Sequence, residues 1–565
     1  MTVDCSPSVG FGQPYNGGLV ERWIVWLLPP LIGAGLGVAV GPFSGFDLLN
    51  RRWMTGWVML SGADGLYGGV ASLLTKPWLH DGAIALLLAP GRWWLGPAVL
   101  GALHGLIASV SYGCIRATAI RLSRASSFLL AMTSILTPLV LMHVGRESGH
   151  LLAGLFLALS VRAFLLSPQR GLYIGLLLGV APLLKVAALL SALALSLAFI
   201  VGLKGAQRIR FVAGFALCMW FGALVPSLLV MIKSGTFSTV EVWGQPVSVV
   251  NGALISSGLV VFASRLNRCP NSDLFLGRFV KSSRTSALFL VSGIVALTWL
   301  VRWSEISDPR FMPPSISDLG RQLFMSGNVR VPTALSDWEV LYLDNSRMVV
   351  VVFTLVAFVL MIGRSQRAGL HQRMLLAAIA IGGSVILVQA TMGYVRYSSQ
   401  SLALLPIAIG CVIGLNQGRA LWRELLVMSV SAIILLPVVD VGVWFRAPGL
   451  KTYGDLTTLL SRDETQLLSD LLPEDGTVFL FGNLTAAVAP ATDRRDVKWL
   501  VSPKRPEHAG TQVAELLYDP SNTRDLDRFT TRGWNFDACQ TLRFRKVSYG
   551  WCSMSTDQGS DSAPP

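Results

Sequence analysis

The sequence predicts an all-α polytopic membrane protein that ends in a small α/β domain, and three observations lead to this fold class. Of the 565 residues, 52% are hydrophobic and only 14% are charged, a balance that is not typical of a soluble enzyme of this size. Long apolar runs recur between Trp23 and Phe445. Beyond Arg446 these runs stop, and a mixed polar pattern that is typical of a soluble domain begins.

The apolar runs predict about thirteen transmembrane helices, because a helix of roughly 20 residues spans the 30 Å hydrocarbon core of a bilayer. Helices are expected because a chain in lipid must satisfy its own backbone hydrogen bonds. The predicted spans cover residues 21–40, 93–115, 124–144, 150–167, 171–185, 186–203, 211–232, 247–264, 285–303, 346–363, 373–392, 400–416 and 423–445.

The connections between the spans predict the orientation of the chain. Every second connection is basic, and basic connections face the cytoplasm in most membrane proteins. The N-terminus is then inside, and an odd number of spans places the C-terminal domain outside. These loops explain most of the net charge of +14, so no nucleic-acid partner is expected. Their basic residues are Arg116, Arg121, Arg124, Arg162, Arg170, Lys204, Arg208, Arg210, Arg265, Arg268, Arg278, Lys281, Arg284, Arg364, Arg367, Arg373, Arg419 and Arg423.

The membrane domain is expected to cover residues 21–446. Residues 1–20 are polar and rich in Gly and Pro, which predicts a loose cytoplasmic tail without a cleavable signal peptide. The outer connection at 41–92 is too apolar for a disordered loop and predicts short helices that lie along the membrane interface. A second outer connection, at 304–345, is expected to form a lid.

The C-terminal part is expected to be a soluble domain outside the membrane, at residues 447–552. Residues 553–565 are rich in Ser, Asp and Pro, which predicts a disordered tail. The hydrophobic pattern of the domain predicts one helix and three strands. The helix is expected at 454–472 and the strands around 478–481, 497–501 and 541–552.

Two of the seven cysteines, Cys539 and Cys552, lie close together in this domain. Disulfides form in oxidising compartments, and the predicted orientation places the domain in one. We therefore expect a disulfide between these two residues. No spacing of cysteine and histidine residues in the chain is typical of a zinc site.

An acidic residue, Asp47, follows the first predicted span. An amphipathic segment runs from it to Leu60, and a turn with Gly62, Asp64 and Tyr67 comes next. The arrangement therefore indicates a reactive site rather than packing against lipid.

The order and membrane side of several motifs resemble those of the GT-C glycosyltransferases. The resemblance is closest to the polyprenol-phosphate-dependent family 87 type, which includes bacterial mannosyltransferases, and it extends over about residues 20–420. The motifs that carry it are Asp47 with its turn, the stretch Leu88-Ala89-Pro90, the Gly-rich span 171–185 that ends in Lys185, the stretch 243–248, and Arg396-Tyr397 ahead of Leu404-Leu405-Pro406.

This resemblance implies a GT-C fold and an inverting transfer of a sugar, mannose or arabinofuranose, from a polyprenyl-phosphate donor. The acceptor would be a lipid or a cell-envelope glycan on the outer face of a bacterial plasma membrane. Membrane lipids, the polyprenyl-phosphate sugar and a glycan or glycolipid acceptor are then the partners. No cofactor is implied, and a requirement for a divalent metal stays open.

Two residues are expected to carry the chemistry. Asp47 is the expected base for the acceptor hydroxyl, and the alternative is a helix N-cap. Lys185, at the outer end of its span, is expected to stabilise the leaving phosphate, and the alternative is a lysine that snorkels to the head groups. Further candidates are Arg146, His150 and Arg396 for the donor phosphate, and Asp64, Tyr67, Lys76, His80 and Arg92 for contacts with the head group or the acceptor.

A transporter or flippase of a lipid-linked glycan is the alternative function. Transport requires polar residues along a path through the membrane, whereas the candidate charges gather at the outer face. Asp64 has a second interpretation as a turn former, because Gly65 follows it. His104 and His143 are expected to be packed or hydrogen-bonded residues within spans.

Overall fold

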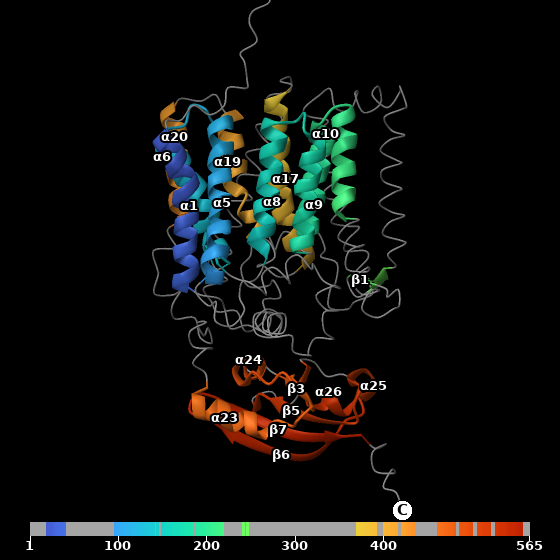
Figure 1. Cartoon of the computed structure of the whole chain (residues 1–565). Coiled ribbons are helices and arrows are strands. Elements are labelled where there is room, and N and C mark those ends of the chain that lie inside the picture. Colours follow the sequence, from blue (N-terminus) through green and yellow to red (C-terminus); the bar gives the residue numbers. More distant parts are fainter. Residues whose placement is uncertain are drawn as a thin grey trace, which may run out of the picture.

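The computed structural model of the chain has a helical part and, beyond one end of it, a small domain built on a sheet (Figure 1). It describes residues 19–40, 95–141, 143–145, 149–185, 188–219, 240–242, 245–247, 369–392, 399–415, 420–435, 460–481, 485–500, 505–520 and 526–556.

The described helices agree with most of the predicted spans that they overlap. The helices are α1 (Leu19–Val40), α5 (Leu95–Thr118), α6 (Arg124–Leu136), α7 (Pro138–Leu141), α8 (His150–Leu166), α9 (Gly171–Leu184), α10 (Ala188–Gly202), α17 (Leu370–Met392), α18 (Ser399–Leu402), α19 (Leu405–Leu415) and α20 (Ala420–Leu435), and residues 206–219 are also helical. A short antiparallel ladder joins β1 (Val240–Val242) and β2 (Gln245–Val247). The spans predicted at 247–264, 285–303 and 346–363 lie outside the described residues, except that Val247 is described as the last residue of β2.

Two of the predicted spans are interrupted. The span predicted at 124–144 divides into α6 and α7, because Pro138 lacks the backbone N–H that a continuing helix needs. The span at 400–416 divides into α18 and α19, with Pro406 in the first turn of α19, where proline is tolerated. His143 consequently lies in a turn rather than in a span.

Among the described residues, α5 is the helix that is long and apolar enough to cross a bilayer by itself, and several shorter apolar helices accompany it. The number of thirteen spans stays a prediction.

Helices α1 and α5 are antiparallel and touch through glycine. The Ser109 hydroxyl donates to the carbonyl of Val25 at 2.7 Å, and the Tyr112 hydroxyl donates to Glu21 at 2.7 Å near the start of α1. Farther along, a Cβ placed on Gly33 would lie 2.1 Å from the carbonyl oxygen of Gly101. The two backbones therefore meet at a distance that only glycine permits, as small residues allow between membrane helices.

We expect Gly33→Ala to lower the free energy of unfolding by about 1–3 kcal/mol, because the added methyl group forces the two backbones apart. Thermal unfolding of the full chain in detergent measures the change. Gly35→Ala, in the same helix, is the matched control, since nothing lies within 4 Å of the added atom. Equal stability of the two variants would contradict the close contact between α1 and α5.

The helical part has two chemically different ends. At one end, which we call the basic end, Arg124 pairs with Glu21 at 2.8 Å, and Arg373 donates to the carbonyl of Leu165 at 3.1 Å. Glu424 accepts a hydrogen bond from the backbone N–H of Ser123 at 2.6 Å, which joins α20 to the start of α6. The basic residues in the terminal turns and connections of this end are Arg22, Arg116, Arg121, Arg124, Arg162, Arg170, Lys204, Arg208, Arg210, Arg373 and Arg423.

The opposite end, which we call the distal end, faces the small domain (Figure 1). Within the described helical part, residues 19–219 and 369–435 with their gaps, Lys185 is the one cation at this end. The described helices therefore carry the charge asymmetry that the sequence predicts for the two sides of a membrane.

The small domain is a five-stranded mixed sheet in the order β4-β3-β5-β7-β6. Strand β3 is parallel to β4 and β5, whereas β7 is antiparallel to β5 and β6. The elements are α23 (Arg462–Leu471), β3 (Thr477–Phe481), the 3₁₀ helix η4 (Thr485–Ala487), α24 (Val488–Thr492), β4 (Lys498–Leu500), α25 (Pro506–Ala509), β5 (Val513–Tyr518), α26 (Asp527–Thr530), β6 (Asn535–Arg543) and β7 (Ser548–Ser555).

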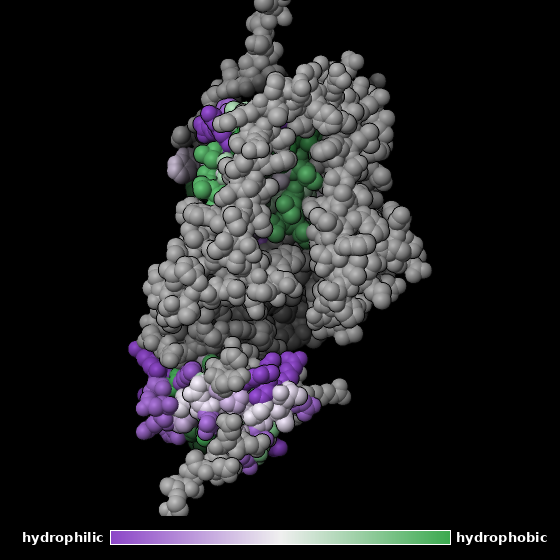
Figure 2. Space-filling model, turned by 90° about the vertical axis from the view of Figure 1, so that its right-hand side faces the viewer, coloured by the Kyte–Doolittle hydropathy of each residue, from purple (hydrophilic) through white to green (hydrophobic). Residues whose placement is uncertain are grey.

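Both faces of this sheet carry a hydrophobic core. One core contains Trp499 and Tyr549, and the other contains Phe529 and Trp534, all with no exposed surface. On the side shown in Figure 2, the described surface of the domain is mostly polar, whereas the described helix residues in view are mostly apolar, with hydrophilic ones at the end farther from the domain. The domain thus has the composition of a soluble unit, in contrast to the helices.

Three details of the domain differ from the sequence prediction. Within the described residues, the helix predicted at 454–472 starts at Arg462, where Ser461 and Glu464 form a capping box, and residues 454–459 lie outside the described part. The strand predicted at 541–552 is wrong as one element, because β6 and β7 form a hairpin that turns at residues 544–547. Strand β5 was not predicted, although it lies at the centre of the sheet.

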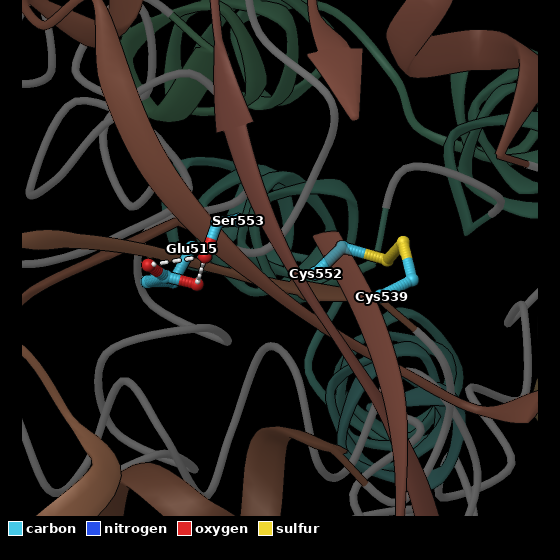
Figure 3. The surroundings of a disulfide bond; sticks show 4 residues. All are labelled: Glu515, Cys539, Cys552 and Ser553. Carbon is cyan, nitrogen blue, oxygen red and sulfur yellow. Dashed lines mark hydrogen bonds between the residues drawn. A yellow bond between two sulfur atoms is a disulfide. The ribbon is translucent and has the colours of Figure 1, made fainter. Parts of the chain in front are cut away.

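Cys539 and Cys552 form a disulfide between the paired strands β6 and β7, with their Cα atoms 4.1 Å apart (Figure 3). On the neighbouring strand β5, both carboxylate oxygens of Glu515 accept hydrogen bonds from the Ser553 hydroxyl at 3.0 Å (Figure 3). Partial burial raises the pKa of the Glu515 carboxyl above its usual value, against the effect of that hydrogen bond. The hairpin therefore carries a covalent link, and β7 also bonds to a partly desolvated acid on β5.

Replacing Cys539 and Cys552 together by serine is expected to destabilise the small domain by about 2–4 kcal/mol, because the link restricts the unfolded chain. Unfolding of the full chain, followed through the tryptophan residues of the sheet, measures the loss. A free-thiol count after denaturation, with and without reductant, is the independent check. Equal counts in the two conditions would contradict the disulfide.

Candidate functional site

Helix α18 brings polar side chains into the distal end of the helical part. Its residues Ser399, Gln400 and Ser401 have no exposed surface. The short helix is closed by backbone hydrogen bonds from Ala403 to Ser399 and from Leu404 to Ser401. Three consecutive buried polar residues among apolar helices are unusual, since buried polar groups must find partners within the protein.

The first of these partners is His150, the first residue of α8. Its Nδ1 lies 2.8 Å from Oε1 of Gln400. Gly149 precedes it in the left-handed conformation, with φ 66°, which starts the helix at this point without a side-chain cap. A Cβ on Gly154, one turn farther along α8, would lie 3.3 Å from the backbone of Gln400. Glycine at this position lets α18 approach α8.

A second hydrogen bond joins α18 to α10, because the hydroxyls of Ser191 and Ser401 lie 2.8 Å apart. Helix α10 starts just after Lys185, whose carbonyl accepts a hydrogen bond from the N–H of Ala188 at 2.8 Å. Lys185 is the C-cap of α9, half-buried and in extended conformation. The lysine and the buried polar residues therefore lie at the same end of the helical part.

Two further histidines extend the group. Nδ1 of His104, on α5, accepts a hydrogen bond from the backbone N–H of Gly145 at 3.0 Å. The rings of His143 and His150 lie 5.5 Å apart between centroids. We call the resulting group the distal polar cluster. Its members are His104, His143, His150, Ser191, Gln400 and Ser401, each at most 7% exposed.

The hydrogen bonds determine which nitrogens carry protons. Because Nδ1 of His104 accepts from a backbone N–H, its neutral ring carries the proton on Nε2. Nε2 of His104 and Nε2 of Gln400 are buried donors without a hydrogen-bond partner, as far as the described residues are concerned. Each such donor costs about 1–3 kcal/mol when it is left unpaired. The cluster is therefore more polar than the packing of the helices requires.

The described part of the chain holds no group of three or more His, Cys, Asp or Glu residues that is arranged to bind a metal ion. The distal polar cluster offers neutral donors and acceptors, and Lys185 offers the positive charge. Such a set suits a ligand that has both hydroxyl groups and a phosphate.

Of the residues selected from the sequence, His150 and Lys185 lie at the distal end, and Cys539 and Cys552 lie in the small domain. The remaining candidates fall outside the described residues, and their roles stay predictions. They are Asp47, Asp64, Tyr67, Lys76, His80, Arg92, Arg146 and Arg396.

The site residues expected from the sequence do not include Ser191, Gln400 or Ser401. A signal for two of them was present, because a polar run from Ser398 to Ser401 precedes an apolar stretch. Ser191 gives no such signal, since single serines are common in apolar helices. His104 is hydrogen-bonded and His143 is in ring contact, as expected. His143, however, lies in a turn and not in a span.

No family model and no curated protein sequence matches the chain. Among solved structures, the chain is similar to the oligosaccharyltransferase of Archaeoglobus fulgidus, which is tethered to an acceptor peptide by a disulfide. This match has 11% sequence identity and a TM-score of 0.46, and it covers 94% of this chain and 74% of the other.

Two structures of ArnT from Cupriavidus metallidurans are also similar, each over 95% of this chain and 98% of the other. The one bound to undecaprenyl phosphate has 12% identity, the apo form has 11%, and both have a TM-score of 0.39. Similarities this weak do not show which residues of the proteins correspond. The function must therefore be argued from the residues of this chain.

Proposed function

We propose that the protein is a membrane glycosyltransferase of the GT-C type that transfers a sugar from a polyprenyl-phosphate donor to a lipid or cell-envelope glycan acceptor. The observation that carries this proposal is the contrast between the two ends of the helical part. Among the described helical residues the cations gather at the basic end, apart from Lys185, which lies at the same end as the distal polar cluster.

A position in the membrane is supported by the outward faces of α1 and α20. Trp23 and Leu31 of α1 are 57% and 65% exposed, and Trp422 of α20 is 68% exposed. Large apolar side chains exposed together on two helices are costly in water and favourable in lipid. The described helices therefore support the membrane location that the composition of the chain predicts.

Two independent features support an outer position for the distal end. Basic residues favour the cytoplasmic side, and they lie at the opposite end of the helices. The disulfide between Cys539 and Cys552 is typical of an oxidising compartment, and the domain that contains it lies beyond the distal end. A polyprenyl-phosphate donor in the outer leaflet would meet Lys185 there.

The chemistry of the transfer needs a base for the acceptor hydroxyl and a positive charge for the leaving phosphate. We assign the second role to Lys185, and the first to Asp47 on the strength of its place in the sequence after the first span. Direct attack by the hydroxyl inverts the configuration at the anomeric carbon. Mannose and arabinofuranose are the proposed sugars, and family 87 is the proposed subtype.

A turnover assay tests the proposal. Purified protein in lipid is given polyprenyl phosphates that carry mannose, arabinofuranose or other sugars, and transfer to a glycolipid acceptor is followed by mass spectrometry. Transfer from one donor, with inversion, is the expected result. Movement of the donor across the bilayer without transfer would overturn the proposal in favour of a flippase.

A further inference from the structure

The hydrogen bond between His150 and Gln400 determines the protonation of a histidine at the distal end. Oε1 of Gln400 is a carbonyl oxygen and can only accept, so the proton of this bond belongs to Nδ1 of His150. In the neutral ring, Nε2 then carries no proton and is a hydrogen-bond acceptor. The bond made by one ring nitrogen thus sets the chemistry of the other.

From this geometry we propose that Gln400 is a positioning residue, which holds the ring of His150 in place and keeps its neutral form protonated on Nδ1. The inference deepens the proposed function, on which it rests for the role of His150 in the transfer. The sequence predicts that His150 contacts the donor phosphate, and the inference changes this role. Neutral His150 accepts a hydrogen bond through Nε2 and does not donate one to a phosphate. A sugar or acceptor hydroxyl is the group that such a nitrogen binds.

The surroundings of Gln400 restrict its orientation. The backbone of α18 is held to α10 through the hydrogen bond between Ser401 and Ser191, and Gly154 lets it lie against α8. The carboxamide is fully buried, so it has little freedom to turn away from His150. The ring of His150 is also in contact with that of His143, at 5.5 Å between centroids. These contacts together hold the imidazole.

The energetics of Gln400 argue against a purely structural role. One end of its carboxamide is paired with His150, but its nitrogen has no hydrogen-bond partner among the described residues. A half-satisfied amide in an apolar interior stabilises a fold less than a leucine of similar size would. A residue that costs stability at this place is better explained by what it does to His150.

Nitrogen-15 NMR of protein labelled at histidine tests the inference without any substrate. The His150 signals are identified by their loss in His150→Gln, and they show directly which ring nitrogen carries the proton at a pH where the ring is neutral. We expect the proton on Nδ1 in the wild type, and a shift of the proton toward Nε2 in Gln400→Leu. Gln400→Glu keeps an acceptor at this position, and we expect it to keep the proton on Nδ1.

Gln372→Leu is the matched control, because Gln372 is a buried glutamine of α17 at the basic end. It should leave the His150 signals unchanged. A wild-type ring protonated on Nε2, or the same signals in Gln400→Leu as in the wild type, would overturn the inference. If Gln400→Leu folds poorly, the position of the ring proton in the wild type and in Gln400→Glu decides the test.

The transfer assay adds a second measurement. Gln400→Leu is expected to lower kcat roughly 10- to 100-fold with a smaller change in KM, the size of effect found when a partner that orients a metal-bound histidine is removed. Gln400→Glu should recover part of the loss. If no donor is turned over by the wild type, the proposed function fails, whereas the NMR result still decides the protonation of His150.

Discussion

Asp47→Asn is expected to abolish sugar transfer, with a loss in kcat of about 10²- to 10⁴-fold, the contribution of a general base. The amide keeps the size of the side chain and its ability to cap a helix, but it cannot take the proton of the acceptor hydroxyl. Binding of the polyprenyl-phosphate donor should stay nearly unchanged. Initial rates and donor binding, measured on the same preparation in lipid, test both statements.

Asp81→Asn is the matched control for this variant. Asp81 belongs to the same outer connection, and its place before Gly82 is typical of a turn, in which asparagine serves as well as aspartate. We expect it to retain most of the activity. Normal turnover of Asp47→Asn, or equal losses in the two variants, would remove Asp47 as the base.

Lys185→Ala is expected to lower kcat/KM by about 10²- to 10³-fold, the loss that follows removal of one group that stabilises charge in a transition state. Negative charge grows on the phosphate as the bond to the sugar breaks, so a fixed cation lowers the barrier more than it favours donor binding. The effect should therefore appear in kcat as well as in KM. Lys185→Arg keeps the charge and should recover part of the loss.

Lys204→Ala provides the comparison, because Lys204 lies at the basic end, just after α10. The same change of charge at that end should leave kcat and KM close to the wild-type values. If Lys185→Ala also turns over normally, Lys185 only snorkels to the head groups. The cation that stabilises the phosphate must then be one of the other candidates.

The helices were largely predictable from the sequence, whereas the polar cluster was not. Apolar runs and basic connections are local signals, so the bounds of α1, α8 and α9 agree with the prediction within two residues. The prediction failed where a short local feature divides an apolar run, as at Pro138 in the span expected at 124–144.

The same limit applies to the small domain. The apolar residues around 478–481 predict a strand by themselves, and the structure has it as β3, at Thr477–Phe481. The pattern at residues 541–552 predicts a single strand across the end of β6 and the start of β7, because the alternation there does not show where the chain turns. The proximity of Cys539 and Cys552 was deduced from the expected compartment and their spacing, and the pairing of the two strands supplies the reason for it.

The composition and the alternation of basic connections thus predict a polytopic helical protein with one basic side and a soluble C-terminal domain. They also place Lys185 as a cation at the other side. These properties depend on residues close together in the chain. The contacts of His150 with Gln400 and of Ser191 with Ser401 join residues more than 200 positions apart. Such pairs depend on how the helices pack in three dimensions, and no local pattern in the sequence encodes that packing.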